Sequence, residues 1–136
     1  MEAVEKILTL KPCAEWSPQA AGWLARAVDT LLDLEDLRAQ FKNGAALFEI
    51  QSEGECIGAF LLRVEDSVHG SVGVVVAASG DLRGVSLLST VLPEIEKLFL
   101  GCKYLRVHSS RAGMASRLLK HGYKPLEVVY GKTLHA

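Results

Sequence analysis

The most constraining feature of the sequence is a continuous apolar run that leads through a polar loop into a helical pattern. The run Ser71–Ala78 is typical of a strand covered on both faces. After the turn-forming stretch Ser79–Gly84, apolar residues recur at helical spacing over Val85–Phe99, and Tyr104–His108 then alternates as another strand. This order predicts a parallel crossover inside a sheet.

The residues before this crossover indicate helices first and strands second. A short strand is expected over Val4–Leu10, and Ser17 followed by Pro18 is a typical helix start. An apolar stripe extends that helix to Leu34, and a second helix over Glu35–Lys42 is expected to end at Asn43-Gly44.

Two strands, Ala45–Gln51 and Cys56–Val64, are expected to form a hairpin through the polar turn between them. Pro93 is expected to kink or break the long helix before Glu94. A helix over Arg111–His121 and a closing strand over Leu126–Leu134 complete the order. We therefore expect one α/β (α+β) domain, residues 1–136, with a mixed central sheet of six to seven strands and about four helices.

The composition of the 136 residues, with 49% apolar and 23% charged residues, excludes a disordered chain. The sequence contains neither a long apolar run nor a signal-peptide pattern, so a cytoplasmic protein without membrane contact is expected. The three cysteines and four histidines show no metal-ligand spacing, and we predict no metal site.

The charge is unevenly distributed, although the net charge of −1 gives no reason to expect nucleic-acid binding. From residue 101 onward the chain has seven basic residues and only one acidic residue, Glu127. This basic third is either a solvated face or a region that attracts a phosphorylated small molecule.

Two segments near the C-terminus resemble the end of the GNAT acyltransferase fold. Arg117–Tyr123 is similar to a helix that closes on Lys-x-Gly-Phe/Tyr, and Val128–Leu134 is similar to the final strand with its lysine. The order of elements resembles the same fold over nearly the whole chain. The resemblance implies acetyl-CoA or another acyl-CoA as cofactor, and an amine on a small molecule or peptide as acceptor.

The resemblance also implies where the cofactor would bind. Strand backbone for the pantetheine would come from Val75, Val76 and Ala77. The turn for the pyrophosphate would be Asp81, Leu82, Arg83, Gly84, Val85 and Ser86. Arg83 fits the family's Arg/Gln-x-x-Gly-x-Gly/Ala pattern, but Ser86 replaces its first glycine and Leu88 replaces its final small residue. A strand-to-helix turn without a cofactor role therefore stays open as an alternative.

Acyl transfer needs a base for the attacking amine and usually an acid for the leaving thiolate. The candidate base is His69, at the start of the apolar strand, and its alternative is an exposed turn histidine. Leu118 stands where many family members have a tyrosine acid. His108 is expected to be a packed or surface residue, and His121 to interact with the end of a helix.

These observations leave two main hypotheses and one weaker alternative. The first is an acyl-CoA-dependent N-acyltransferase that transfers an acetyl group to an amine. The second is a catalytically silent binding or assembly module of the same fold, which could form a homodimer through an edge strand such as Lys124–Leu134. An unrelated mixed-sheet domain with a regulatory ligand is the third.

Overall fold

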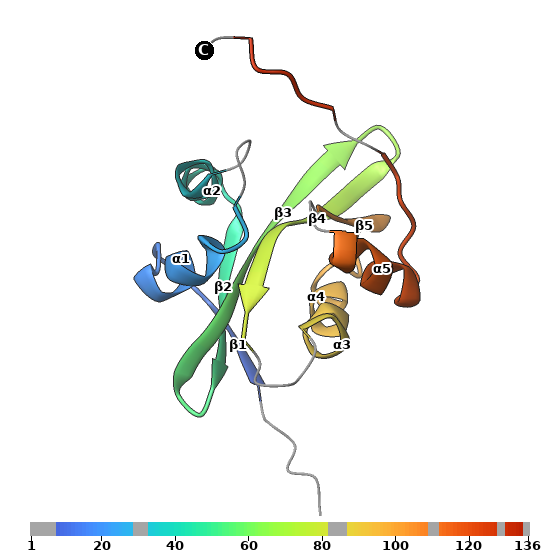
Figure 1. The fold of residues 1–136 in the computed structure, drawn as a ribbon. Coiled ribbons are helices and arrows are strands. Elements are labelled where there is room, and N and C mark those ends of the chain that lie inside the picture. The colour runs from blue at the N-terminus through green and yellow to red at the C-terminus, as the bar shows by residue number, and fades with distance from the viewer. Residues whose placement is uncertain (1–7, 29–32, 82–86, 109–111, 128–129, 135–136) are drawn as a thin grey trace, which may run out of the picture.

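A computed structural model describes residues 8–28, 33–81, 87–108, 112–127 and 130–134. Its centre is a five-stranded sheet in the order β1-β2-β3-β4-β5. Figure 1 shows helices α1 and α2 on one side of this sheet and helices α3, α4 and α5 on the other. This arrangement confirms the predicted α/β fold with a mixed central sheet, although the described residues form five strands instead of six or seven.

The first three strands are antiparallel neighbours. They are β1 (Leu8–Pro12), β2 (Ala46–Ser52) and β3 (Glu55–Ser67). The turn between β2 and β3 is made by Glu53 and Gly54, which both have positive φ angles. The hairpin predicted from the sequence is therefore confirmed.

The next two strands form the predicted parallel pair. β4 (Gly70–Gly80) is antiparallel to β3 and parallel to β5 (Tyr104–Val107). Six consecutive residues of β4, from Val72 to Ala77, are buried. The apolar run of the sequence is thus a strand covered on both faces.

One face of the sheet is covered by α1 (Pro18–Leu24) and α2 (Leu34–Lys42). Ser17 caps α1 by accepting a hydrogen bond from the backbone N–H of Ala20. Asp33 and Asp36 form a capping box at the start of α2, and Asn43 ends that helix before Gly44, whose φ is +108°. The predicted stop at Asn43-Gly44 is confirmed.

The opposite face is covered by α3 (Leu87–Thr90), α4 (Leu92–Leu98) and α5 (Ala112–Lys120). The predicted long helix is broken at Val91, and Pro93 lies in the first turn of α4, where its missing N–H costs no hydrogen bond. Helix α5 ends before Gly122, whose φ is +86°.

Three predicted boundaries differ from the structure. The first strand ends at Pro12 rather than at Leu10, and residues 4–7 of the predicted strand lie outside the described residues. Helix α1 ends at Leu24, since the backbone N–H groups of Arg26 and Ala27 bond three residues back instead of four. The apolar stripe beyond Leu24 still packs, because Ala27 and Val28 contact the core without being helical.

The predicted closing strand is the third difference. Neither Lys124–Glu127 nor Tyr130–Leu134 is a strand, and both stretches are exposed. Alternating apolar residues make a segment suitable for a sheet, but they do not supply the neighbouring strand that it must pair with. The prediction of a strand here was therefore wrong for the described residues.

Candidate functional site

The candidate site lies where β4 and β5 stop pairing. The parallel register runs from Val72 opposite Tyr104 to Val75 opposite Val107. The backbone N–H of His108 then donates to the carbonyl oxygen of Val75 at 3.4 Å, which is long for such a bond. β4 continues to Gly80, so its last five residues have no pairing partner on β5.

A β-bulge in β4 coincides with this opening. On β3, Leu62 pairs with Val75 while its neighbour Leu61 pairs with Ala77, so Val76 is an extra residue in the ladder. A bulge bends its strand and increases the local twist. The bend begins at the residue where β5 ends, and β4 consequently remains bound to β3 alone.

The open half of β4 is held against β3 by a close contact of two glycines. A Cβ atom built on Gly58 would lie 2.8 Å from the carbonyl oxygen of Ser79 and 3.0 Å from the Cα of Gly80. A Cβ atom built on Gly80 would lie 2.9 Å from the carbonyl oxygen of Ile57. Glycine at both positions therefore allows the two backbones to approach after the bulge.

The structure places part of the predicted cofactor site at this opening. Val75, Val76 and Ala77 are buried and lie where the pairing with β5 ends. Asp81 follows β4 directly, and its backbone N–H donates to the carbonyl oxygen of Ile57 at 2.9 Å. The other predicted cofactor residues, Leu82, Arg83, Gly84, Val85 and Ser86, lie outside the described residues, as does the side chain of Leu88.

His69, the candidate base, lies at the other end of β4. It belongs to the turn between β3 and β4, is exposed, and donates its backbone N–H to the hydroxyl of Ser67 at 3.3 Å. Six residue steps separate Gly70 from Val76, which is about 20 Å of strand. The structure does not bring His69 together with Val75–Ala77.

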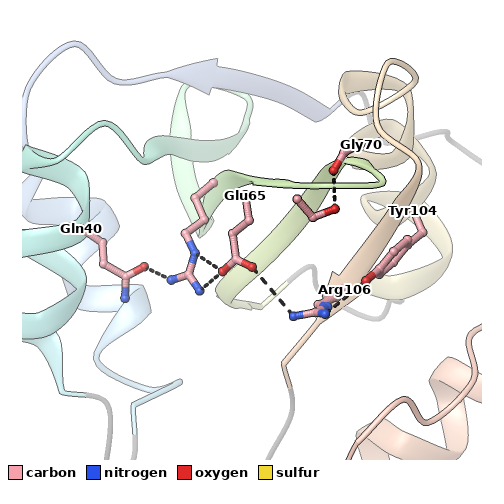
Figure 2. Close-up of polar contacts among 7 residues, drawn as sticks. Gln40, Glu65, Gly70, Tyr104 and Arg106 are labelled. Carbon is pink, nitrogen blue, oxygen red and sulfur yellow. Dashed lines mark hydrogen bonds and ion pairs between the residues drawn. The ribbon is translucent and has the colours of Figure 1, made fainter.

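A network of charged side chains joins β3 and β5 beside the paired half of β4. Figure 2 shows it as a row from Gln40 through Glu65 to Arg106 and Tyr104. Arg63 donates twice to Oε1 of Glu65, from Nε at 3.1 Å and Nη2 at 2.6 Å, and once more to Gln40. Arg106 lies 3.8 Å from the other Glu65 oxygen and donates to the hydroxyl of Tyr104 at 3.1 Å.

The electrostatics of this network follow from one carboxylate between two guanidinium groups. Arg63 chiefly, with smaller contributions from Arg106 and His108, lowers the pKa of Glu65. The Tyr104 hydrogen bond, and to a lesser degree Glu127 and Glu65, raises the pKa of Arg106. The Nε atom of Arg106 is buried without a hydrogen-bond partner among the described residues, so within them Arg106 is the less completely bonded of the two arginines.

A second carboxylate, Glu49 on β2, was not found from the sequence. It accepts hydrogen bonds from the hydroxyl of Ser17 at 2.8 Å and from the amide of Gln51 at 3.2 Å. Burial alone would raise its pKa, but these hydrogen bonds outweigh burial and lower it. Glu49 pairs with Ala59, which pairs with Ser79 in the open half of β4. Glu49 therefore lies in the same row of the sheet as Ser79, and only the pairing of the strands could have shown this.

The thiols near Glu49 lack the environment of a reactive cysteine. Burial first, and then the negative charge of Glu49, raises the pKa of Cys13. Burial also raises the pKa of Cys56. Reactive cysteines usually have lowered pKa values and positive neighbours. These two thiols are therefore small packing groups.

The predicted absence of an acid at Leu118 has a structural counterpart. Leu118 is buried and packs with Leu92 between α4 and α5. Tyr123 packs on the same cluster and donates its hydroxyl proton to Glu96 at 2.6 Å. Burial and this hydrogen bond raise the pKa of Tyr123 well above its usual value, which makes the hydroxyl a poor proton donor.

A hollow of about 500 Å³ lies elsewhere, between the C-terminal ends of α2 and α4. Phe48, Leu62 and Phe99 contribute apolar surface to it, and Asn43 and Arg63 contribute polar atoms. It contains none of the residues at the strand opening. The hollow is therefore distinct from the candidate site.

No protein-family model matches the sequence, and neither does any curated protein sequence. Solved structures do match the fold. A GNAT family acetyltransferase from Elizabethkingia anophelis with acetyl-CoA bound aligns with a TM-score of 0.69 and 16% identity, over 88% of this chain and 78% of that one. This chain has the GNAT fold.

Two further solved structures show how widely the match extends. An aminoglycoside acetyltransferase from an uncultured soil metagenomic sample, in complex with sisomicin, has a TM-score of 0.68 and 14% identity, over 94% of this chain and 97% of that one. A transcriptional regulator from Bacillus halodurans C-125 has a TM-score of 0.67 and 16% identity, over 96% and 100%. These likenesses show a shared fold. Any chemical activity has to be argued from the residues of this chain.

None of the described helices is long and apolar enough to cross a membrane.

Proposed function

We propose that this chain is an acyl-CoA-dependent N-acyltransferase, which binds acetyl-CoA or a related thioester between β4 and β5 and transfers the acyl group to an amine. The observation that carries the proposal is that pairing with β5 ends at Val75 while β4 continues to Gly80. The bulge at Val76 bends the strand at the same point.

The open half of β4 can supply backbone hydrogen bonds to an extended ligand. Peptide groups that face away from β3 after Val75 have no partner on β5, and unpaired strand edges readily bind extended chains. Val75, Val76 and Ala77 are the residues of the proposed pantetheine contact. Arg83 and the basic C-terminal third, both proposed from the sequence, would attract the phosphates of the nucleotide.

The structural matches support the same proposal at the level of fold. One of the matching acetyltransferases contains acetyl-CoA and another contains an aminoglycoside. An acyl thioester and a small-molecule amine are accordingly the substrate classes to test first. The role of base that the sequence gives to His69 stays a prediction. The turn that contains His69 lies at the end of β4 that is distant from the opening.

The first test is a calorimetric titration with acetyl-CoA, desulfo-CoA and free CoA. We expect all three to bind, because the nucleotide and pantetheine contacts do not require the thioester. The variant Arg83→Ala should weaken binding about tenfold, the loss of one charge-assisted contact to phosphate. Arg38→Ala, an exposed arginine on α2, is the matched control and should bind as the unchanged chain does.

One result would exclude cofactor binding at the opening between β4 and β5. Millimolar acetyl-CoA that gives neither heat nor amide chemical-shift changes near Val75–Ala77 would exclude binding at the opening. Binding without transfer to any amine would instead favour the second hypothesis, a silent module.

The silent module is favoured by one specific observation. Leu118, at the position of the expected acid, is buried in the contact between α4 and α5, so no proton donor occupies that place. The described part of the predicted dimer edge, Lys124–Leu134, is not a strand. An assembly role would instead use the edge of β5, which is the last strand of the described sheet. A homodimer of this kind predicts a molecular mass in light scattering that rises with protein concentration, and a constant monomer mass would exclude it.

A further inference from the structure

We infer that His108 is the base that removes a proton from the acceptor amine. The inference rests on the proposed acyltransferase function and names the residue that would act in it. It differs from the sequence-based expectations, which place the base at His69 and give His108 a packing or surface role.

The backbone places His108 at the opening between the strands. Its N–H makes the bond to the carbonyl oxygen of Val75 that follows the last paired residues. The next residue of β4 is Val76, where the bulge lies. An acyl group held along the open half of β4 would therefore have His108 as its first neighbour from β5.

The side chain of His108 lies on the face of β5 that carries its polar residues. Leu105 and Val107 pack against the apolar clusters under α4 and α5. Tyr104 and Arg106 point to the opposite face and contact each other there, and strand alternation assigns His108 to that face. The contribution of His108 to lowering the pKa of Glu65, after the larger contributions of Arg63 and Arg106, agrees with this side.

This face of β5 gives an acceptor access to the opening. The helices on the same side, α1 and α2, pack mainly over β2, β3 and β4. His108 is exposed, and 40% of Tyr104 is exposed. Among the residues that the structure describes, none forms a hydrogen bond with the imidazole of His108. The side chain is thus available to a ligand that approaches from this face.

Imidazole is the side chain that most often serves as a base near neutral pH. In the proposed reaction, His108 accepts one proton from the ammonium group of the acceptor. The nitrogen lone pair then attacks the acyl carbon, so that a C–N bond forms and the C–S bond breaks. The sulfur leaves with the bonding electron pair and takes the second proton from the nitrogen, and His108 returns its proton to water.

The test compares three single substitutions of histidine by glutamine, which keeps a polar side chain but cannot act as a base. His108→Gln is the test, His69→Gln is the competing candidate, and His121→Gln, an exposed residue that follows α5, is the control. Acetyl transfer is followed by release of the CoA thiol, with sisomicin, spermidine and a short peptide with a free N-terminus as acceptors.

We expect His108→Gln to reduce the transfer rate about 100-fold, the lower end of the usual contribution of a general base. Acetyl-CoA affinity should stay within about twofold, since a base does not hold the nucleotide. Added imidazole should restore part of the rate in His108→Ala. The control His121→Gln should keep the full rate.

A second readout does not depend on turnover. The imidazole signals of His108 should shift when desulfo-CoA is added, because the proposed site lies beside them, whereas the signals of His69 should not. Unchanged His108 signals in a chain that binds desulfo-CoA would overturn the inference.

The outcomes separate this inference from the proposed function. A chain that binds acetyl-CoA and transfers the acetyl group with unchanged rate in His108→Gln would contradict the inference and retain the function. Loss of transfer in His69→Gln alone would restore the sequence-based prediction. A chain that neither binds acetyl-CoA nor acetylates any of the three amines would contradict the function itself, and the role of His108 with it.

Discussion

The two halves of β4 have similar sequences but different surroundings. From Val72 to Val75 the strand is paired on both sides, with β3 and with β5. From Ala77 to Gly80 it is paired with β3 alone among the described strands, and Val76 is the unpaired bulge residue between the two halves. Both halves contain small and β-branched residues, and the four residues from Val74 to Ala77 are all buried.

The comparison shows that hydrophobicity decides burial but does not decide pairing. A long apolar strand can remain in the core while one of its edges is unpaired, provided that the neighbouring strand is shorter and a bulge bends the backbone away. In this chain the four residues of β5 are the limiting length. The open edge is therefore a property of the strand pair and not of β4 alone.

The largest effect is expected where the open half contacts β3. Gly58→Ala should lower the free energy of unfolding by about 3 kcal/mol, because the added methyl group meets the backbone atoms of Ser79 and Gly80 at 3.0 Å or less. Backbone atoms in a ladder cannot move aside without breaking it. Chemical denaturation measures the change.

A matched control for this substitution is Gly22→Ala in α1. A Cβ atom at Gly22 has no atom within 4 Å, so alanine should raise the stability by about 0.5 to 1 kcal/mol through its helix propensity. Equal effects of the two alanines would show that the close approach after the bulge is absent.

A smaller loss is expected in the paired half, at Gly73. A Cβ atom there would lie 2.6 Å from the ring of Phe99, and a ring at the end of a side chain can move more easily than a backbone. Gly73→Ala should cost about 2 kcal/mol. Combining it with Phe99→Leu should recover part of that loss, and no recovery in the double variant would contradict the contact.

The carboxylates of Glu49 and Glu65 allow the two halves of β4 to be compared by the pH dependence of stability. Glu49 lies in a row of the sheet with the open half, and Glu65 lies in a row with the paired half. Both have pKa values below the usual 4.5. Their stabilisation is therefore complete above about pH 4.5 and is lost as the pH falls through the lower folded values. Denaturation curves between pH 7 and pH 3 should show this acid-side loss.

Glu49→Gln should cost about 1 kcal/mol at pH 7 and should reduce the acid-side loss, because the hydrogen bonds from Ser17 and Gln51 then lose their charged acceptor. An unchanged stability at pH 7, or an acid-side slope as steep as in the parent chain, would show that these bonds do not hold the charge.

The smallest effect is expected for Glu65→Gln, about 0.5 kcal/mol. The Glu65 side chain is 40% exposed, so water screens its ion pairs with Arg63 and Arg106. The loss should shrink further in 1 M salt, while the Glu49→Gln loss should change less. A Glu65→Gln effect larger than that of Glu49→Gln would reverse this ranking.

Much of the fold could be predicted because local patterns determine its elements. Ser17-Pro18, Asn43-Gly44 and Pro93 mark helix boundaries through their own backbone chemistry, and the structure has boundaries at each of them. The run Ser71–Ala78 likewise predicted a buried strand with a parallel neighbour. These signals require no knowledge of distant residues.

The candidate site was less predictable because it depends on where strands end and how they pair. The resemblance implied a pantetheine contact at Val75, Val76 and Ala77, but the register that makes Val76 a bulge has no local signal in the sequence. His69 was placed at the start of the correct strand without knowledge that the opening lies at its other end. Glu49 accepts a hydrogen bond from Ser17, which is 32 residues away in the sequence. No local spacing pattern could have predicted this contact.

The contact of Phe99 with Gly73 determines which end of α4 is fixed to the sheet. The ring anchors the C-terminal end of α4 to the doubly paired half of the sheet. Because this contact holds only one end of the helix, we expect any displacement of α4 to be largest at its first turn, where Val91 joins it to α3.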